Sequence, residues 1–434
     1  MKDTGKQKLV EFVDSQQDFA VEFLRQLVRF DSTFIDQGVG GHELAIQQWL
    51  DVRLQDWGFQ TRLFEPDNET MKDYPDFNPG HDYTDRPNLV AILPGAGRGR
   101  SLILNGHVDT VPLGDREQWT HDPLGGEVVD GKMYGRGTCD MKAGVAAMIL
   151  AVRFLQEAGL ELQGDVLIQT VVDEEGGGNG TLSCVAEGYR ADAAIVTEPT
   201  SLRILPASRG VFLLQVDVEG KATHAALKWG GVNAIEKAIK IIQGMNELER
   251  LWLARRNSPL LPSPTITIGK IEGGLAGAIV AGECSMKFDV KYLPVEVDPD
   301  GTERRITGEM VKQEVEDWIA IICAGDDWLR EHPPTLNWYL HVLPHYLDPG
   351  HPLVGAMCSA SQEVLEWSVV SGMPSGADAR ILQNAGDVPT VIFGPGNLQQ
   401  AHSIDEYVSL SQYMDAIKVL AVGIYGWTSQ GEEG

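Results

Sequence analysis

The chain has 434 residues, more than a single hydrophobic core usually accommodates, so we expect two domains. Its 35 Lys and Arg residues stand against 62 Asp and Glu residues, and the net charge of −27 excludes nucleic acid and anionic membrane surfaces as partners. Five cysteines lie far apart, so we expect reduced thiols and no disulfide framework. The N-terminal stretch lacks the apolar core of a signal peptide, and no run reaches membrane-spanning length, so we expect a cytoplasmic protein.

The first part of the chain predicts two helices and a loop. Apolar residues recur at helical spacing over 14–30 and again over 40–58. The segment 64–88 is aromatic and acidic, and its Pro, Gly and Asn content predicts a long ordered loop. A functional loop and a surface insertion without a role in catalysis are both open interpretations.

Four short apolar runs rich in β-branched residues follow and predict buried strands: 88–93, 100–105, 165–172 and 191–197. A strong helix pattern over 141–159 lies between the second and the third run. Alternation of strand and helix indicates an α/β fold with a mainly parallel sheet. Open sheets of this kind bind ligands beyond the carboxyl ends of their strands. Four residues that come shortly after a run are therefore expected at one rim: His107, Glu174, Glu175 and Glu198.

A second unit is predicted to interrupt the first. From Arg209 the spacing of apolar residues predicts, in order, a strand, a helix, two strands, a helix and a strand. This order indicates a ferredoxin-like α+β module. A helix over 351–367 and a strand over 388–396 then resume the first unit. The predicted domains are a catalytic domain, 1–208 with 346–434, and an inserted lid or dimerisation domain, 209–345.

Five residues that can bind metal through oxygen or nitrogen are spread along the chain: His107, Asp140, Glu175, Glu198 and His402. Carboxylates and imidazoles suit hard or borderline divalent cations. A site with this much negative charge can hold two ions around one water, which is an arrangement typical of hydrolases.

Seven fragments occur in a fixed order: NGHVDTVP, YGRGTCDMKAG, VVDEEGGGNGT, TEPTS, GKATHAA, GADAR and AHSIDEYV. Together they resemble the M20-type metallopeptidase and deacylase family, which contains acetylornithine deacetylase, succinyl-diaminopimelate desuccinylase, aminoacylase and glutamate carboxypeptidase. Any one fragment is weak evidence, whereas the ordered set is specific.

The resemblance implies a centre of two divalent ions, with Zn²⁺ preferred and Co²⁺ as the other candidate. His107 and Glu198 would hold one ion, Glu175 and His402 the other, and Asp140 would bridge them. Ions about 3.5–4 Å apart need a shared carboxylate to offset their repulsion, and a water between them becomes hydroxide near neutral pH. The family also implies a cis peptide bond after Asp140.

Three further residues are candidates for the chemistry. Glu174 is the expected general base, since it adjoins a ligand and can move a proton from water to the leaving amine. Asp109, two residues after His107, is expected to accept the spare N–H of that ring through its carboxylate. The resemblance assigns His224 to the oxyanion of the tetrahedral intermediate, often from the partner subunit of a dimer.

Substrate binding is assigned to Arg380, Lys291 and Asn233. Relatives commonly carry Arg at the position of Lys291, and lysine lacks the two-pronged grip that arginine offers a carboxylate. A structural ion pair is the rival interpretation for Arg380. The remaining histidines, His81 among them, are not at a two-ligand spacing and are expected to be surface or core residues.

The leading hypothesis is a di-zinc amidohydrolase that removes an acyl group from a small N-acylated amine or amino acid, most like acetylornithine deacetylase. A metal-bridging water would attack the amide, with Glu174 as general base. The alternatives are a desuccinylase, a dipeptidase or carboxypeptidase, an N-formyl aminopyrimidine deformylase, and a catalytically silent metal-binding scaffold. A homodimer formed through the inserted unit is expected from the resemblance.

Overall fold

The computed structural model describes residues 4–36, 39–298 and 300–430. The chain divides into two compact units. Unit 1 consists of Met1–Pro206, Leu347–Ser371 and Ala377–Gly434, and unit 2 of Ala207–Tyr346 and Gly372–Gly376. The predicted boundaries lie within two residues of the main limits, but the short return of 372–376 to unit 2 was not predicted.

Unit 1 is built on a twisted sheet with the strand order β10-β21-β9-β5-β8-β4-β3. The strands are β3 (Gln60–Phe64), β4 (Asn88–Leu93), β5 (Leu102–His107), β8 (Val166–Val171), β9 (Ala194–Val196), β10 (Ile204–Ser208) and β21 (Thr390–Ile392). The four central strands, β21, β9, β5 and β8, run parallel to one another. The predicted α/β class with a parallel sheet is therefore confirmed.

One of the four predicted strands differs in direction. β4 runs antiparallel to both of its neighbours, β3 and β8. The connection from β4 to β5 is only the short segment 94–101, whereas parallel strands need a crossover of a dozen or more residues. The sheet is parallel at its centre and antiparallel at its edges.

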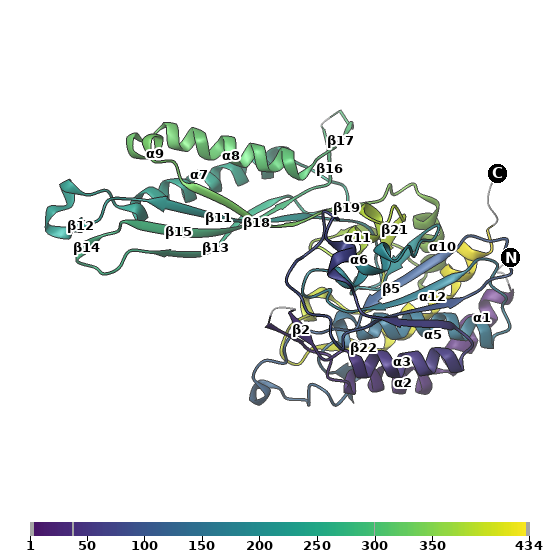
Figure 1. The fold of residues 1–434 in the computed structure, drawn as a ribbon. Helices are drawn as coiled ribbons and strands as arrows, with labels where there is room; N and C mark the ends of the chain where they lie inside the picture. Colours follow the sequence, from purple (N-terminus) through teal and green to yellow (C-terminus); the bar gives the residue numbers. More distant parts are fainter. Residues whose placement is uncertain (1–3, 37–38, 299, 431–434) are drawn as a thin grey trace. The chain divides into compact units, whose positions relative to one another are not determined.

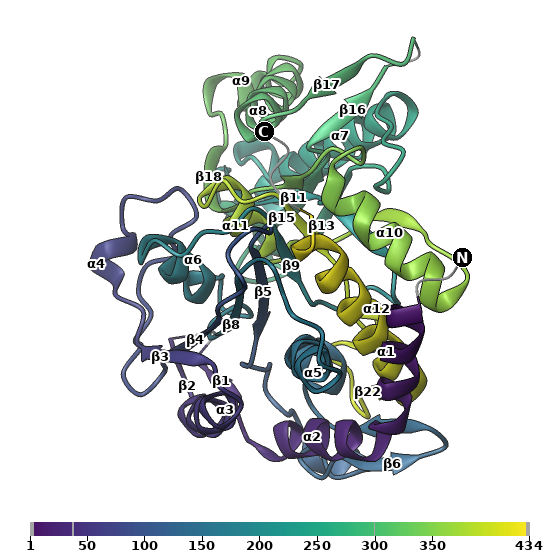
Figure 2. The same cartoon turned by 90° about the vertical axis from the view of Figure 1, so that its right-hand side faces the viewer.

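Helices cover both faces of this sheet: α5 and α12 lie on one face, and α6 and α11 on the other (Figures 1 and 2). The helices of unit 1 are α1 (Thr4–Ser15), α2 (Gln17–Arg29), α3 (Leu44–Asp56), α4 (Asn68–Met71), α5 (Ala143–Glu157), α6 (Asn179–Ala186), α10 (Pro352–Leu365), α11 (Ala379–Asn384) and α12 (Leu410–Thr428). The expected helices correspond to α2, α3, α5 and α10, while α1, α4, α6, α11 and α12 were not predicted. Among the described residues, no helix has the length and apolar character needed to cross a membrane.

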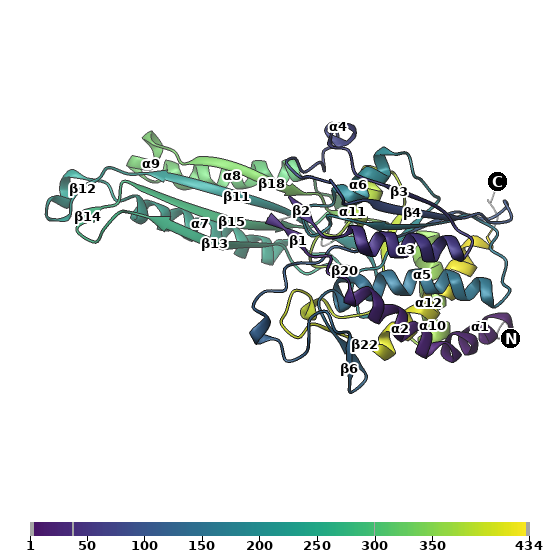
Figure 3. The ribbon, with the colours of Figure 1, turned by 60° about the horizontal axis from the view of Figure 1, so that its bottom comes forward.

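The segment between β3 and β4 contains the single short helix α4 and is otherwise irregular, as predicted for 64–88. It lies beside α6 (Figure 3). Short strands complete unit 1: β1 (Phe34–Ile35), β2 (Gly40–Gly41), β6 (Glu127–Val129), β7 (Lys132–Tyr134) and β22 (Tyr407–Ser409). The strand β20 (Val370–Met373) begins in unit 1 and ends in the segment that belongs to unit 2.

Unit 2 has an antiparallel sheet in the order β13-β15-β11-β18, with two long helices on one face (Figure 1). Its main elements are β11 (Gly210–Glu219), α7 (Ala234–Arg255), β13 (Thr265–Gly273), β15 (Glu283–Tyr292), α8 (Gly308–Ala324) and β18 (Thr335–Val342). Its minor elements are β12 (Thr223–His224), β14 (Ile279–Val280), β16 (Val295–Val297), β17 (Glu303–Arg305), α9 (Asp327–Glu331) and β19 (His345–Tyr346). Alternate residues of β11, such as Leu214 and Val216, are buried in the core beneath the helices, as the period of two requires.

Candidate metal centre

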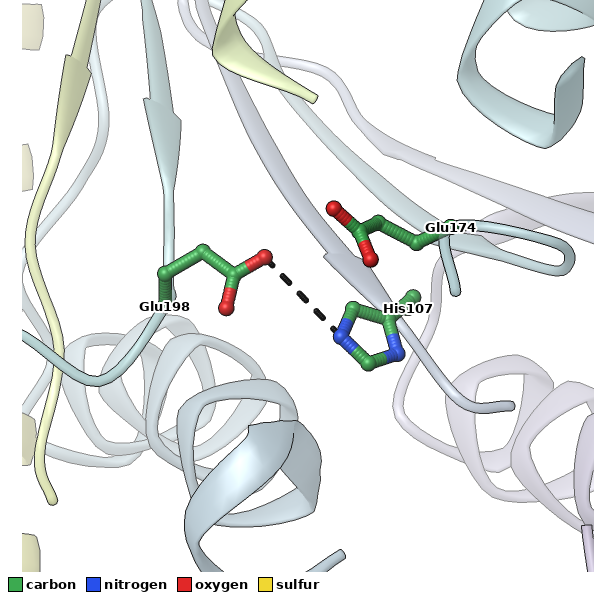
Figure 4. Close-up of side chains that lie close together, drawn as sticks. All are labelled: His107, Glu174 and Glu198. Carbon is green, nitrogen blue, oxygen red and sulfur yellow. Dashed lines mark ion pairs between the residues drawn. The ribbon is translucent and has the colours of Figure 1, made fainter. Parts of the chain in front are cut away.

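Three parallel strands deliver polar side chains to one edge of the sheet. β5 ends at His107, which pairs in register with Val171 at the end of β8, so Glu174 and Glu175 follow at the same level. The last residue of β9, Val196, pairs with Asn105, two residues before the end of β5, so Glu198, two residues after Val196, follows at the level of His107. The side chains of His107, Glu174 and Glu198 converge from these three strand ends (Figure 4).

Asp140 lies at the centre of the cluster. It belongs to the turn Thr138–Lys142 that leads into α5, where its own backbone is non-helical (φ −123°, ψ 97°), and the peptide bond after it is cis, as expected. Its Oδ1 lies 3.1 Å from Nε2 of His107, and its Oδ2 lies 3.3 Å from Nε2 of His402. The two oxygens of one buried carboxylate therefore face two different histidines.

A second carboxylate accompanies each histidine. Nε2 of His402 lies 2.9 Å from Oε1 of Glu175, and Nε2 of His107 lies 3.9 Å from Oε1 of Glu198. Among the described residues, two groups could hold an ion with ligand atoms within 4.8 Å of one another: His107 with Glu174 and Glu198, and His107 with Asp140 and Glu175. His402 is outside these groups, but it contacts Asp140 and Glu175 directly.

The electrostatics of the cluster are those of a site built for cations. Burial, together with the charges of neighbouring carboxylates, raises the pKa of Glu198 and of Glu174 well above the ordinary value. Hydrogen bonds to Asp140 and Glu175 raise the pKa of His402 to about 10. Burial opposes a charge on His107, but Asp140 and the nearby acids outweigh it and raise that pKa as well. Without metal, protons on these groups offset the crowded negative charge.

The donor set therefore fits divalent metal ions. It offers only imidazole nitrogen and carboxylate oxygen, which suit Zn²⁺ and similar cations. Burial and the neighbouring acids raise the pKa values of these carboxyl groups. A bound cation that replaces the protons would stabilise the carboxylate form of each group. The two faces of Asp140 allow one carboxylate to serve two ions.

Asp109 supports the site in a different way from that predicted. Nδ1 of His107 donates to the backbone oxygen of Asp109 at 2.9 Å, while the Asp109 carboxylate is 3.6 Å from Nδ1. The carboxylate instead accepts the backbone N–H groups of Glu174 and Glu175 at 3.3 and 3.1 Å. The ring is still oriented by a hydrogen bond at Nδ1, which leaves Nε2 toward the cluster. The predicted acceptor atom was wrong because both carboxylate oxygens serve the neighbouring turn.

The glycine-rich run after Glu175 closes this turn against the sheet. Gly178 has φ +91°, a conformation that glycine adopts without strain. A Cβ on Gly180 would lie 1.9 Å from the backbone oxygen of Val172. The run therefore lets the backbone approach the end of β8 closely.

Arg380 is buried within unit 1 and is engaged by its own chain. Its Nη2 donates to the backbone oxygen of Gly177 at 2.8 Å, and its guanidinium lies 3.6 Å from Asp76 and 3.7 Å from Asp378. Only 6% of the residue is exposed. These contacts favour the structural ion pair over a free grip on a substrate carboxylate.

The other three candidates lie in unit 2. His224 is exposed, and its Nδ1 accepts the N–H of Ala226 at 3.1 Å, so the ring proton is on Nε2. Asn233 caps α7 by accepting the N–H of Ile235. Lys291 pairs with Asp289 at 2.8 Å.

The structure also reveals supporting residues that the sequence analysis missed. His81, expected to be an ordinary surface or core residue, and Tyr83 both contact the carboxylate of Asp173, immediately before Glu174. Glu406 accepts the N–H groups of Cys139 and Asp140. Glu406 lies within the AHSIDEYV fragment and Asp173 within VVDEE, so the motifs contained the signal, but nothing in the sequence indicated their partners.

The fold and the cluster define a class, the metal-dependent hydrolases of amide bonds. The model of "Peptidase family M20/M25/M40" matches residues 103–424, and the chain belongs to this family. N-formyl-4-amino-5-aminomethyl-2-methylpyrimidine deformylase of Bacillus subtilis is 35% identical over 90% of this chain and 90% of its own length. Acetylornithine deacetylase of Pectobacterium carotovorum is 30% identical over 74% of this chain and 78% of its own length.

Solved structures have the same fold. Aminopeptidase PepT of Bacillus cereus superposes with a TM-score of 0.72 at 22% identity, over 95% of this chain and 99% of its own. The YXEP protein of Bacillus subtilis, described as a dinuclear metal-binding peptidase of the M20 family, has a TM-score of 0.63 at 16% identity, over 95% and 98% of the two chains.

Proposed function

We propose that the protein is a two-metal deformylase that hydrolyses the N-formyl amide of a small amine, with an aminomethylpyrimidine as the first candidate for the amine. The observation that carries the two-metal part is Asp140, whose two oxygens face His107 and His402 separately. Similarity along 90% of both chains to a deformylase supports the choice of acyl group and amine.

His107 and Glu198 would hold one ion, Glu175 and His402 the other, and Asp140 would bridge them. The pairing of each histidine with one carboxylate supports this division. The nitrogen and oxygen donors support Zn²⁺, with Co²⁺ as the second candidate. When bound, the ions would lower the pKa of water and polarise the amide carbonyl.

Glu174 would move the proton. It takes a proton from the attacking water as the C–O bond forms, and gives it to the nitrogen as the C–N bond breaks, so the products are formate and the free amine. Its side chain lies beside His107 and Glu198 at the strand ends, which supports this role (Figure 4). Asp109 would position this residue through the N–H groups of Glu174 and Glu175.

His224 would stabilise the negative charge that develops on the carbonyl oxygen. Its Nδ1 is used by Ala226, so the free Nε2–H is a donor for an oxyanion. Asn233, whose side-chain oxygen caps α7, keeps its amide N–H groups for a substrate.

The contacts of the cationic candidates favour a substrate without an α-carboxylate. Arg380 is paired with Asp76 and Asp378, and Lys291 is paired with Asp289. The α-carboxylate of an N-acyl amino acid would have to displace one of these aspartates before it could pair with Arg380 or Lys291. An N-formylated heteroaromatic amine has no such requirement, which favours the deformylase over the acetylornithine deacetylase alternative.

A homodimer formed through unit 2 is part of the proposal. Large apolar side chains are exposed around β12 and β14, notably Trp229 at 83% and Leu275 at 82%. Exposed apolar patches of this kind typically mark protein interfaces. We also expect the protein to work in the cytoplasm, since all five cysteines are free thiols.

The proposal is tested by measuring release of free amine from N-formyl, N-acetyl, N-succinyl and peptide substrates. We expect the N-formyl aminomethylpyrimidine to give the highest kcat/KM. Higher kcat/KM on N-acetylornithine would support the second candidate, and inactivity on the whole panel would refute hydrolysis as the function.

A further inference from the structure

The turn that carries Glu174 and Glu175 begins at Asp173, a residue in an unfavourable backbone conformation. Asp173 has φ +67° and is fully buried. A non-glycine residue in this region needs support from its surroundings. The position of Glu174 depends on whatever holds Asp173 in place.

The carboxylate of Asp173 accepts hydrogen bonds from two side chains of the segment between β3 and β4, and a third, Arg86, lies 4.0 Å from it. Nδ1 of His81 donates to it at 2.9 Å, and the hydroxyl of Tyr83 donates at 2.7 Å. The same hydroxyl accepts an N–H of Asn179 at 2.8 Å. Nε2 of His81 lies 3.1 Å from Nδ2 of Asn78, so Nε2 accepts this N–H while Nδ1 donates to Asp173.

The far end of the turn is held by Asn78. Its side chain donates to the backbone oxygen of Gly176 at 2.7 Å. Its backbone accepts from, and donates to, the side chain of Asn179 at 2.7 and 3.0 Å. The segment between β3 and β4 therefore binds the turn at both ends, at Asp173 and at Gly176. This segment lies beside α6 (Figures 2 and 3).

We propose that Asn78, His81 and Tyr83 form a positioning clamp that fixes the turn of Glu174 and Glu175 for catalysis. None of the three is assigned as a metal ligand or a base, so each acts through another residue. A largely buried network of hydrogen bonds of this kind rigidifies what it holds. The catalytic part of this proposal rests on the proposed function, because Glu174 must be the base for its position to matter.

Tyr83→Phe tests the clamp with the loss of one atom, and Tyr74→Phe is the matched control. Tyr74 lies in the same segment and is partly exposed. We expect Tyr83→Phe to lower kcat on the best formylated substrate about tenfold with KM within about twofold, since small misplacements of reacting groups cost rate. The Tyr74→Phe protein should match the wild type.

A second measurement is the affinity of the metal-free protein for Zn²⁺, determined by competition with a chelator. This affinity reports on the position of Glu175, because Glu175 is a proposed ligand on the same turn. We expect Tyr83→Phe and His81→Ala to weaken it several-fold. His81→Asn, which keeps a donor near the position of Nδ1, should recover part of that affinity and of kcat. Recovery by the conservative variant would separate positioning from a general loss of folding.

The clamp is overturned if Tyr83→Phe keeps both the kcat and the Zn²⁺ affinity of the wild type. It is also overturned if Tyr74→Phe loses as much kcat as Tyr83→Phe. A third contradicting result is that His81→Asn and His81→Ala have the same kcat and Zn²⁺ affinity. If the wild-type protein hydrolyses no amide in the panel, the proposed function fails. The Zn²⁺ affinities of the same variants then still decide whether the clamp positions Glu175.

Discussion

Each histidine of the cluster holds a proton that a metal ion would replace. Asp140 and Glu175 raise the pKa of His402 to about 10, and Asp140 is the main partner that raises the pKa of His107. These pairs stabilise the metal-free protein fully below the ordinary histidine pKa of about 6.5. For His402 the contribution is lost as the pH rises through about 10.

Binding of Zn²⁺ to the metal-free protein should therefore release protons at pH 7, because a histidine ligand must be neutral. Titration calorimetry in buffers with different ionisation enthalpies measures the number released. Affinity should also rise with pH over the neutral range. Binding without proton release would contradict the assignment of His107 and His402 as ligands.

Replacing Glu174 by Gln should lower kcat by about 10²–10⁴-fold, because it removes the general base. The metal content should stay at the wild-type level, since Glu174 is not an assigned ligand. Glu175→Gln is the matched comparison and should lower the metal content. Unchanged activity of Glu174→Gln would refute its role, and a wild-type protein without activity would favour the scaffold alternative.

At the scale of elements, a buried ion pair joins the strand β22 region to the turn that carries Asp140. Oε2 of Glu406 accepts from Nη1 of Arg136 at 2.7 Å. Its Oε1 accepts the N–H groups of Cys139 and Asp140 at 2.8 and 3.1 Å. Arg136 is 3% exposed and Glu406 is fully buried.

Arg136→Met should lower the free energy of unfolding by about 3–5 kcal/mol, because it leaves the Glu406 carboxyl buried without its charged partner. Urea unfolding measures the loss. Arg250→Met, which breaks an exposed pair with Glu247, should cost at most about 1 kcal/mol. Equal losses in the two variants would show that the buried pair does not hold this turn.

The elements that could be predicted from the sequence are those with a local pattern. Apolar runs indicated β5, β8 and β9, and the parallel-sheet rule then brought His107, Glu174 and Glu198 to one rim. The antiparallel direction of β4 follows from the short segment 94–101 before β5, whereas the apolar runs alone indicate strands and not their directions. The partners of Asp173 lie about ninety residues earlier in an irregular segment, and so they could not be inferred.

The residues proposed for catalysis and the residues proposed for dimerisation lie in different units. Unit 1 contains the five proposed ligands, and unit 2 contains His224 and the exposed apolar side chains around β12 and β14. A net charge of −27 disfavours non-specific association. An apolar surface on so acidic a chain therefore supports a specific interface.

Sedimentation should show a dimer for the wild-type protein and a shift toward monomer for Trp229→Glu, because the charge would be buried in the proposed interface. Ile321→Glu is the control, since Ile321 is exposed on α8, away from β12 and β14. A wild-type monomer, or a Trp229→Glu protein that stays dimeric, would contradict the proposed interface.

The most direct test of the account is a titration of the metal-free protein with Zn²⁺ while hydrolysis of the N-formyl aminomethylpyrimidine is measured. Two ions that share Asp140 predict that activity reaches its plateau at about two equivalents of Zn²⁺ per chain. Full activity without metal, or a plateau at one equivalent with no second ion bound, would contradict it.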